Sequence, residues 1–188
     1  GILLAIFSFA FIPPLIVTFI YGETLTEIFL YSFLFLISLG GLMWLISRQK
    51  GLPLNISDGF IITTMFWVVL ACAGSIPFYF FGLSINDAIF ESVSGITTTG
   101  ATLIVGLDDL PKSLLLYRQL LQWIGGMGLI ILAVAVMPAL GIGGSQLYKM
   151  ELPGSHGNQK LTPKITDSAK ALWKIYFGLT LALSLIHI

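Results

Sequence analysis

The chain has 188 residues and a formal net charge of zero; 56% of its residues are hydrophobic and 10% are charged. Soluble domains carry roughly a quarter charged residues, so this composition and a mean hydropathy of +0.97 exclude a soluble globular protein. They predict an all-α integral membrane protein in contact with the lipid bilayer. Zero net charge gives no basis for nucleic-acid binding, and the single cysteine, Cys72, excludes an internal disulfide.

Two apolar segments open the chain. Residues 2–20 carry no charge and residues 28–47 form a second apolar run, and about twenty such residues cross the hydrocarbon core. Pro13 and Pro14 lack backbone donors, so a kink is expected in the first segment. We therefore predict two transmembrane helices within residues 1–50.

A third span is predicted at residues 60–81, and a shorter apolar piece follows at residues 86–96. Asn86 or Asp87 is the expected cap of this short helix. About eleven residues reach only about half way through the hydrocarbon core. We therefore expect a re-entrant helix whose last, unsatisfied carbonyls point toward the membrane centre, where a cation is favoured.

A hydroxyl-rich run follows the short helix and consists of Thr97, Thr98, Thr99 and Gly100. Such residues suit an extended backbone that turns its carbonyl oxygens toward a dehydrated cation. Gly100 permits dihedral angles that other residues resist. Taken alone, the run also fits a surface loop, but its place after a capped half-helix favours a cation filter made of these four residues.

A polar bend at residues 106–112 leads to a fourth span, from residue 113 to about residue 140. Gly125, Gly126 and Gly128 interrupt this span and predict either close helix contact or a local bend. A polar, glycine- and proline-rich stretch at residues 141–168 is predicted to be a loop. A fifth span is expected to begin at residue 169.

Basic residues set the predicted orientation. Arg48, Lys50 and the lysines of residues 149–174 lie in two loops on one side, which the positive-inside rule assigns to the cytoplasm together with the N-terminus. The opposite side receives the acids Glu23, Glu27, Asp87, Glu91, Asp108 and Asp109 and the bases Lys112 and Arg118. An acidic mouth of this kind concentrates cations within a screening length of about 8 Å.

Two charged residues near the filter have alternative interpretations. Glu91 is either an ion ligand or a structural charge that accepts hydrogen bonds from loop amides. Arg118 either extends to the outer interface or braces the pore loop. No span contains an aspartate pair or a hydrolase motif, and His156 and His187 are isolated. We therefore expect neither an enzyme nor a cofactor, and no metal other than potassium.

Several motifs occur in a specific order: residues 95–102, 106–111, 117–119, 122–128, 141–148 and 151–154. With these motifs the chain closely resembles the Trk/Ktr/HKT superfamily of potassium transporters, and within it the TrkH-type membrane subunit. The resemblance covers most of the chain from about residue 58 onward. It implies potassium uptake through a selectivity filter, with no covalent chemistry.

The resemblance also implies a domain organisation. The family's pore consists of four covalently linked repeats of helix, pore loop and helix, and TrkH members carry two extra helices in front. Residues 1–50 are then the extra helices, and residues 58–140 are the first repeat. Residues 141–168 become a cytoplasmic loop, and residues 169–188 the first helix of a second, truncated repeat.

The family's filter motif places the carbonyls of Thr98, Thr99 and Gly100, with Thr97 beside them, on the ion path. The family implies a multi-pass protein of the bacterial inner (plasma) membrane that forms a homodimer with a cytoplasmic nucleotide-binding regulatory subunit (TrkA-like). One repeat supplies one quarter of a filter, so we expect an N-terminal fragment of such a transporter. The alternative is a non-conducting truncated fragment or assembly element.

Overall fold

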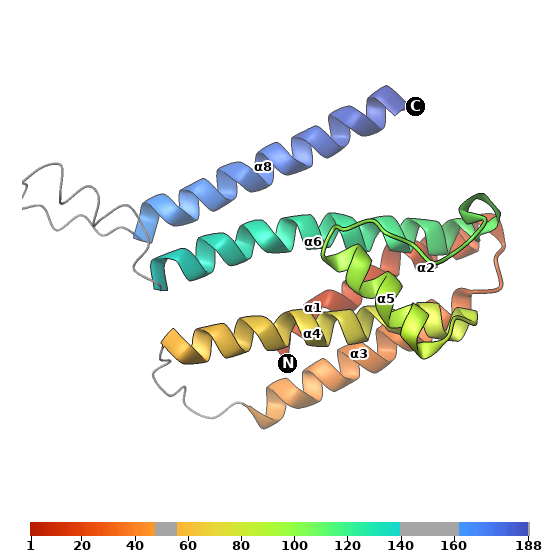
Figure 1. The fold of residues 1–188 in the computed structure, drawn as a ribbon, viewed down its shortest axis with the longest axis horizontal. Helices are drawn as coiled ribbons and strands as arrows, with labels where there is room; N and C mark the ends of the chain where they lie inside the picture. The colour runs from red at the N-terminus through yellow and green to blue at the C-terminus, as the bar shows by residue number, and fades with distance from the viewer. Residues whose placement is uncertain (48–55, 140–161, 188) are drawn as a thin grey trace, which may run out of the picture. The chain divides into compact units, whose positions relative to one another are not determined.

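The computed structural model describes residues 1–47, 56–139 and 162–187, and all regular structure in these ranges is helical (Figure 1). Within these described ranges, three segments are long and apolar enough to cross a membrane: Ile2–Tyr21, Thr26–Ile46 and Thr64–Phe81. The all-α membrane class is thus confirmed. The chain divides into two compact units, residues 1–53 with 62–126 and residues 54–61 with 127–188. Residues 97–100, named the filter run after their predicted role, lie in the first unit with their surroundings.

The first apolar segment is a broken helix. Helix α1 (Ile2–Ser8) passes into a 3₁₀ turn, η1 (Phe9–Phe11), and helix α2 (Ile12–Tyr21) follows. The break lies directly before Pro13 and Pro14, because proline removes a donor and its ring collides with the preceding turn. The helix is thus interrupted next to the paired prolines, and the predicted kink itself stays a prediction.

Helix α3 (Thr26–Ile46) packs closely on α1. A Cβ built on Gly40 would lie 2.7 Å from the backbone nitrogen of Ala5, closer than real Cβ contacts allow. The two helices therefore meet backbone to backbone, as small residues allow in membranes.

Helix α4 (Ile56–Phe81) ends where the sequence predicted, and helix α5 (Ile85–Ile96) follows. The predicted cap of α5 was wrong by two or more residues, because Ser84 is the N-cap. The backbone of Ser84 is extended, and its hydroxyl oxygen accepts a hydrogen bond from the Asp87 amide at 3.2 Å. Asp87 instead lies in the first turn, where its carboxylate accepts the Ser84 hydroxyl at 2.8 Å and faces the positive end of the helix.

A 3₁₀ turn, η2 (Leu107–Asp109), precedes helix α6 (Lys112–Ala139), close to the predicted fourth span. Helix α8 (Thr162–His187) begins seven residues before the predicted fifth span. The predicted loop at residues 141–168 is therefore wrong at its C-terminal end, because residues 162–168 are helical. Pro163 lies in the first turn of this helix, a position that proline fits. Its remainder lies outside the described residues.

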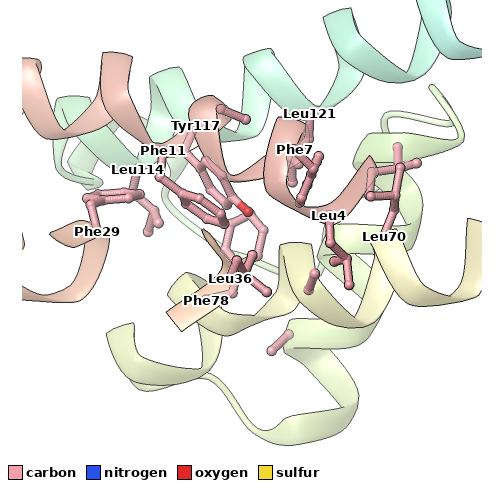
Figure 2. Close-up of a cluster of buried hydrophobic side chains, with 14 of the residues drawn as sticks. Leu4, Phe7, Phe11, Phe29, Leu36, Leu70, Phe78, Leu114, Tyr117 and Leu121 are labelled. Atoms are coloured by element: carbon pink, nitrogen blue, oxygen red, sulfur yellow. The ribbon is translucent and has the colours of Figure 1, made fainter. Parts of the chain in front are cut away.

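Tyr117 is the centre of the buried cluster in the first unit (Figure 2). Its ring lies 5.3 Å from Phe11, 5.6 Å from Phe29 and 5.4 Å from Phe78, measured between ring centroids. Its hydroxyl donates to the Gly74 carbonyl at 2.8 Å. A buried tyrosine needs such a partner. This one residue therefore joins η1, α3 and α4 to α6.

Glycines allow α5 to lie against its neighbours at backbone distance. A Cβ on Gly125 of α6 would lie 1.9 Å from the Ile96 carbonyl oxygen, and one on Gly95 of α5 would lie 3.0 Å from Leu121 Cβ. Helix α6 stays helical through Gly126 and Gly128. Close contact, one of the two predicted roles, is therefore found at Gly125, while a bend at Gly126 or Gly128 remains a prediction.

The Gly125 contact generates a test. We expect Gly125→Ala in the full-length protein to lower the thermal unfolding midpoint in detergent, because the added methyl forces α6 away from Ile96. Gly41→Ala is the control, since a Cβ there meets nothing within 4 Å and alanine favours the helix by about 1 kcal/mol. Equal midpoints for the two variants would contradict this packing.

Candidate functional site

The filter run begins as a turn that closes the end of α5. The amides of Thr97, Thr98, Thr99 and Gly100 donate to carbonyls of the last helical turn, at 2.9, 3.0, 3.0 and 3.3 Å respectively. The acceptors are Val93, Gly95 and, for the last two amides, Ser94. We expected unsatisfied carbonyls at the end of α5 to face the ion path. This expectation is wrong for the carbonyls of Val93, Ser94 and Gly95, because they accept hydrogen bonds from the amides that follow.

The same hydrogen bonds fix where the carbonyls of the run point. In a trans peptide unit the carbonyl lies opposite the next residue's N–H, and this chain has no cis peptide among its described residues. Because the amides of Thr98, Thr99 and Gly100 point back at α5, the carbonyls of Thr97, Thr98 and Thr99 point away from it. Residues 97–100 are all exposed, so this turn lies at the surface of the first unit.

Two left-handed residues produce this turn. Gly100 has φ +75° and Thr98 has φ +58°. The glycine was predicted from its residue type. The threonine was missed, since a β-branched residue is an outlier at positive φ and nothing in the sequence signals it. Such strain persists only where surrounding contacts hold it, and it concentrates at functional sites.

The hydroxyls of Thr97 and Thr99 form hydrogen bonds with the end of α5 and with each other. Thr97 Oγ1 donates to the Val93 carbonyl at 2.8 Å and lies 2.8 Å from Thr99 Oγ1. A hydroxyl carries one hydrogen, so Thr99 is the donor in the second bond. The hydroxyls of Thr97 and Thr99 therefore tie the run to the end of α5 and to each other.

A buried ion pair supports the far end of the run. Glu91 is fully buried; its Oε1 accepts Thr102 Oγ1 at 2.6 Å and the Leu103 amide at 2.7 Å, and its Oε2 accepts Arg118 Nε at 2.8 Å. Arg118 Nη2 donates to the Gly100 and Ala101 carbonyls at 3.4 and 3.3 Å. These contacts favour the structural interpretation of Glu91, and Arg118 braces the loop that follows α5.

The predicted acidic mouth divides into structural and exposed charges. Glu23 accepts hydrogen bonds from the Lys112 amide at 2.6 Å, the Ser113 amide at 3.2 Å and the Ser113 hydroxyl. Asp108 and Asp109 are exposed in η2 and line an open depression together with Glu23. Of these three acids, Asp108 and Asp109 present their charge to solvent. Glu23 was missed as a contact residue because its partners lie 89 and 90 positions away.

Potential metal ligands are dispersed. Among the residues that the structure describes, no three His, Cys, Asp or Glu side chains come together in a way that could hold a metal ion. Cys72 is free and exposed, whereas His156 lies outside the described ranges. The candidate cation ligands remain those predicted from the sequence, residues 97–100.

Comparison with known proteins identifies the family. A family described as TrkH, cation transport protein, matches residues 26–188. The chain belongs to the TrkH family. Because TrkH proteins are transporters, the expectation of a protein other than an enzyme is confirmed at the level of the family.

Individual relatives support the same family assignment. The chain is 50% identical over 185 residues to the Trk system potassium uptake protein TrkH of Vibrio parahaemolyticus, covering 97% of this chain and 38% of that protein. It is 46% identical over 188 residues to the same-named protein of Escherichia coli K12, covering 98% and 39% respectively. The crystal structure of the potassium transporter TrkH from V. parahaemolyticus matches with a TM-score of 0.80 and 46% identity, over 97% of this chain and 36% of that one. The chain thus spans about two fifths of the length of these TrkH proteins.

The Glu91–Arg118 pair gives a prediction on stability. We expect Arg118→Met in the full-length protein to lower the free energy of unfolding by about 3–5 kcal/mol, because it leaves a buried carboxylate without its partner. Adding Glu91→Gln removes that charge and should recover part of the loss. Denaturant unfolding measures both, and Lys112→Met, an exposed change on the same helix, is the control. Additive losses in the double variant would contradict direct pairing.

Proposed function

We propose that this chain supplies one filter segment of a potassium uptake pore. The observation that carries the proposal is the turn after α5, whose amides return to the helix and whose carbonyls at Thr97, Thr98 and Thr99 point outward on an exposed face. The names of the TrkH relatives, which are potassium uptake proteins, support the same ion. Permeation through such a segment needs no covalent chemistry and no cofactor.

The physical basis is replacement of water by carbonyl oxygens. A potassium ion leaves its hydration shell only where protein dipoles of matching number and field strength take over. One segment of outward carbonyls contributes one side of such a ring, so other segments must complete it. The chain's coverage of about two fifths of its relatives agrees with one complete pore loop out of several.

The four filter residues have different roles in this proposal. The family's motif implies the carbonyls of Thr98, Thr99 and Gly100, with Thr97 beside them, on the ion path. We propose instead that Thr97, Thr98 and Thr99 provide the ion-facing carbonyls. Gly100 provides the left-handed backbone that lets the chain leave the turn, and its own carbonyl is contacted by Arg118. Asp108 and Asp109, exposed beside the loop, attract cations toward the mouth.

The proposal includes the wider organisation. Residues 1–50 are accessory helices, residues 58–140 form the first repeat, and residues 169–188 belong to the first helix of the next. The complete protein is a multi-pass protein of the bacterial inner membrane with a cytoplasmic N-terminus. It forms a homodimer and binds a nucleotide-binding regulatory subunit of the TrkA kind on the cytoplasmic side.

Rubidium uptake in a bacterial strain without its own potassium systems tests the function. We expect the full-length gene to restore uptake and the 188-residue chain alone to give none. The chain alone would then be the non-conducting fragment that its coverage of the relatives suggests. Uptake by the chain alone would contradict a ring shared among several segments, and failure of the full-length gene would contradict the proposed function.

Gly100 variants test the filter in the same assay. Gly100→Ala should lower potassium-over-sodium discrimination by about 5- to 30-fold, since a left-handed alanine costs roughly 1–2 kcal/mol. Gly100→Asn should have a smaller effect because asparagine tolerates this conformation better. Gly82→Ala is the matched control, as Gly82 also has positive φ and open space but lies in the turn before α5. Equal discrimination in Gly100→Ala and Gly82→Ala would contradict the filter assignment.

A further inference from the structure

We infer that the helices before the pore repeat brace the filter from outside that repeat, with Glu23 as the positioning residue. The inference rests on the proposed function, because ion discrimination is one of its readouts. Two separate contacts carry it, one polar and one aromatic. Both join residues 1–46 to the N-terminal part of α6.

The polar contact caps α6. The first amides of a helix have no partner within the helix, and here Glu23 Oε1 accepts from Lys112 while Oε2 accepts from Ser113. A carboxylate at this position also meets the positive end of the helix dipole. Helix α5 is capped by its own neighbour Ser84, whereas the cap of α6 comes from the loop between α2 and α3. The start of α6 is therefore fixed by an element that precedes the repeat.

The aromatic contact fixes α6 one turn further along. Phe11 stacks on Tyr117 with 22° between the ring planes, and Phe29 meets the same ring nearly edge on, at 65°. Figure 2 shows these rings packed together in the buried cluster. Both phenylalanines belong to the helices that precede the repeat. The rotation of α6 about its own axis is thereby set at Tyr117.

The next residue, Arg118, reaches the filter. It pairs with Glu91 and contacts the Gly100 and Ala101 carbonyls. From Lys112 to Arg118 the helix rises about 9 Å, which places the arginine less than two turns below the Glu23 cap. A shift or rotation of α6 at its outer end therefore moves the guanidinium relative to the two carbonyls that it holds.

The experiment compares Glu23→Ala, Glu23→Gln and Glu27→Ala in the full-length protein, with rubidium uptake and its inhibition by sodium measured per molecule in the membrane. Glu23→Ala should lower potassium-over-sodium discrimination about fivefold, the ratio that corresponds to loss of a helix cap. Glu23→Gln keeps one acceptor oxygen and should lie between wild type and Glu23→Ala. Glu27, exposed in the first turn of α3, is the matched control: its replacement removes the same charge from the same side, so any effect on cation attraction is shared, and potassium-over-sodium discrimination should stay at the wild-type value.

The outcomes separate this inference from the proposed function. If wild type transports and Glu23→Ala changes only the amount of protein in the membrane, Glu23 merely stabilises the fold and the inference is overturned. If wild type does not transport, the proposed function fails, and the bracing is then decided by unfolding alone. A double-mutant cycle of Glu23→Ala with Arg118→Met should be non-additive if Glu23 positions Arg118, and additive losses would overturn the inference without any transport measurement.

Discussion

The buried ion pair between Glu91 and Arg118 is the contact on which the loop after α5 depends. Removing two charges from water costs several kcal/mol per ion unless geometry and further hydrogen bonds compensate. Here the carboxylate accepts three hydrogen bonds and the guanidinium also contacts two carbonyls. The pair therefore joins α5, α6 and the irregular segment that follows the filter run. Because both side chains are buried, this arrangement is far less sensitive to salt than a surface pair.

The ion pair and the α5 turn act at opposite ends of the filter run. At the near end, four amides return to the carbonyls of Val93, Ser94 and Gly95. At the far end, Arg118 and Ser94 hold the Ala101 carbonyl. The backbone between them has little freedom, so the direction of its carbonyls is set by the fold itself. Under the proposed function, such preorganisation reduces the ordering that ion binding requires.

Much of the helical framework could be predicted from the sequence. Apolar runs of about twenty residues, the paired prolines and the short length of α5 each have a direct physical cause in residue type. Gly100 and Gly125 were predictable for the same reason, although the sequence left two roles open for Gly125. The contacts of Arg118 with Glu91 and of Glu23 with α6 were less accessible, because they join residues 27 and about 90 positions apart. Periodicity and capping rules describe neighbours in the chain, and these contacts depend on how the helices pack.

The acids show how packing changes the meaning of a charge. Sequence alone counts Glu23, Glu91 and Asp108 equally as negative charges on one side of the membrane. In the structure Glu91 and Glu23 accept hydrogen bonds that hold the loop and α6, whereas Asp108 is exposed. In the proposed pore, the field that attracts a cation comes mainly from the exposed acids, while the bonded acids keep the carbonyls of the filter run in place. Under that proposal attraction and selection belong to different residues, and a change in one need not alter the other.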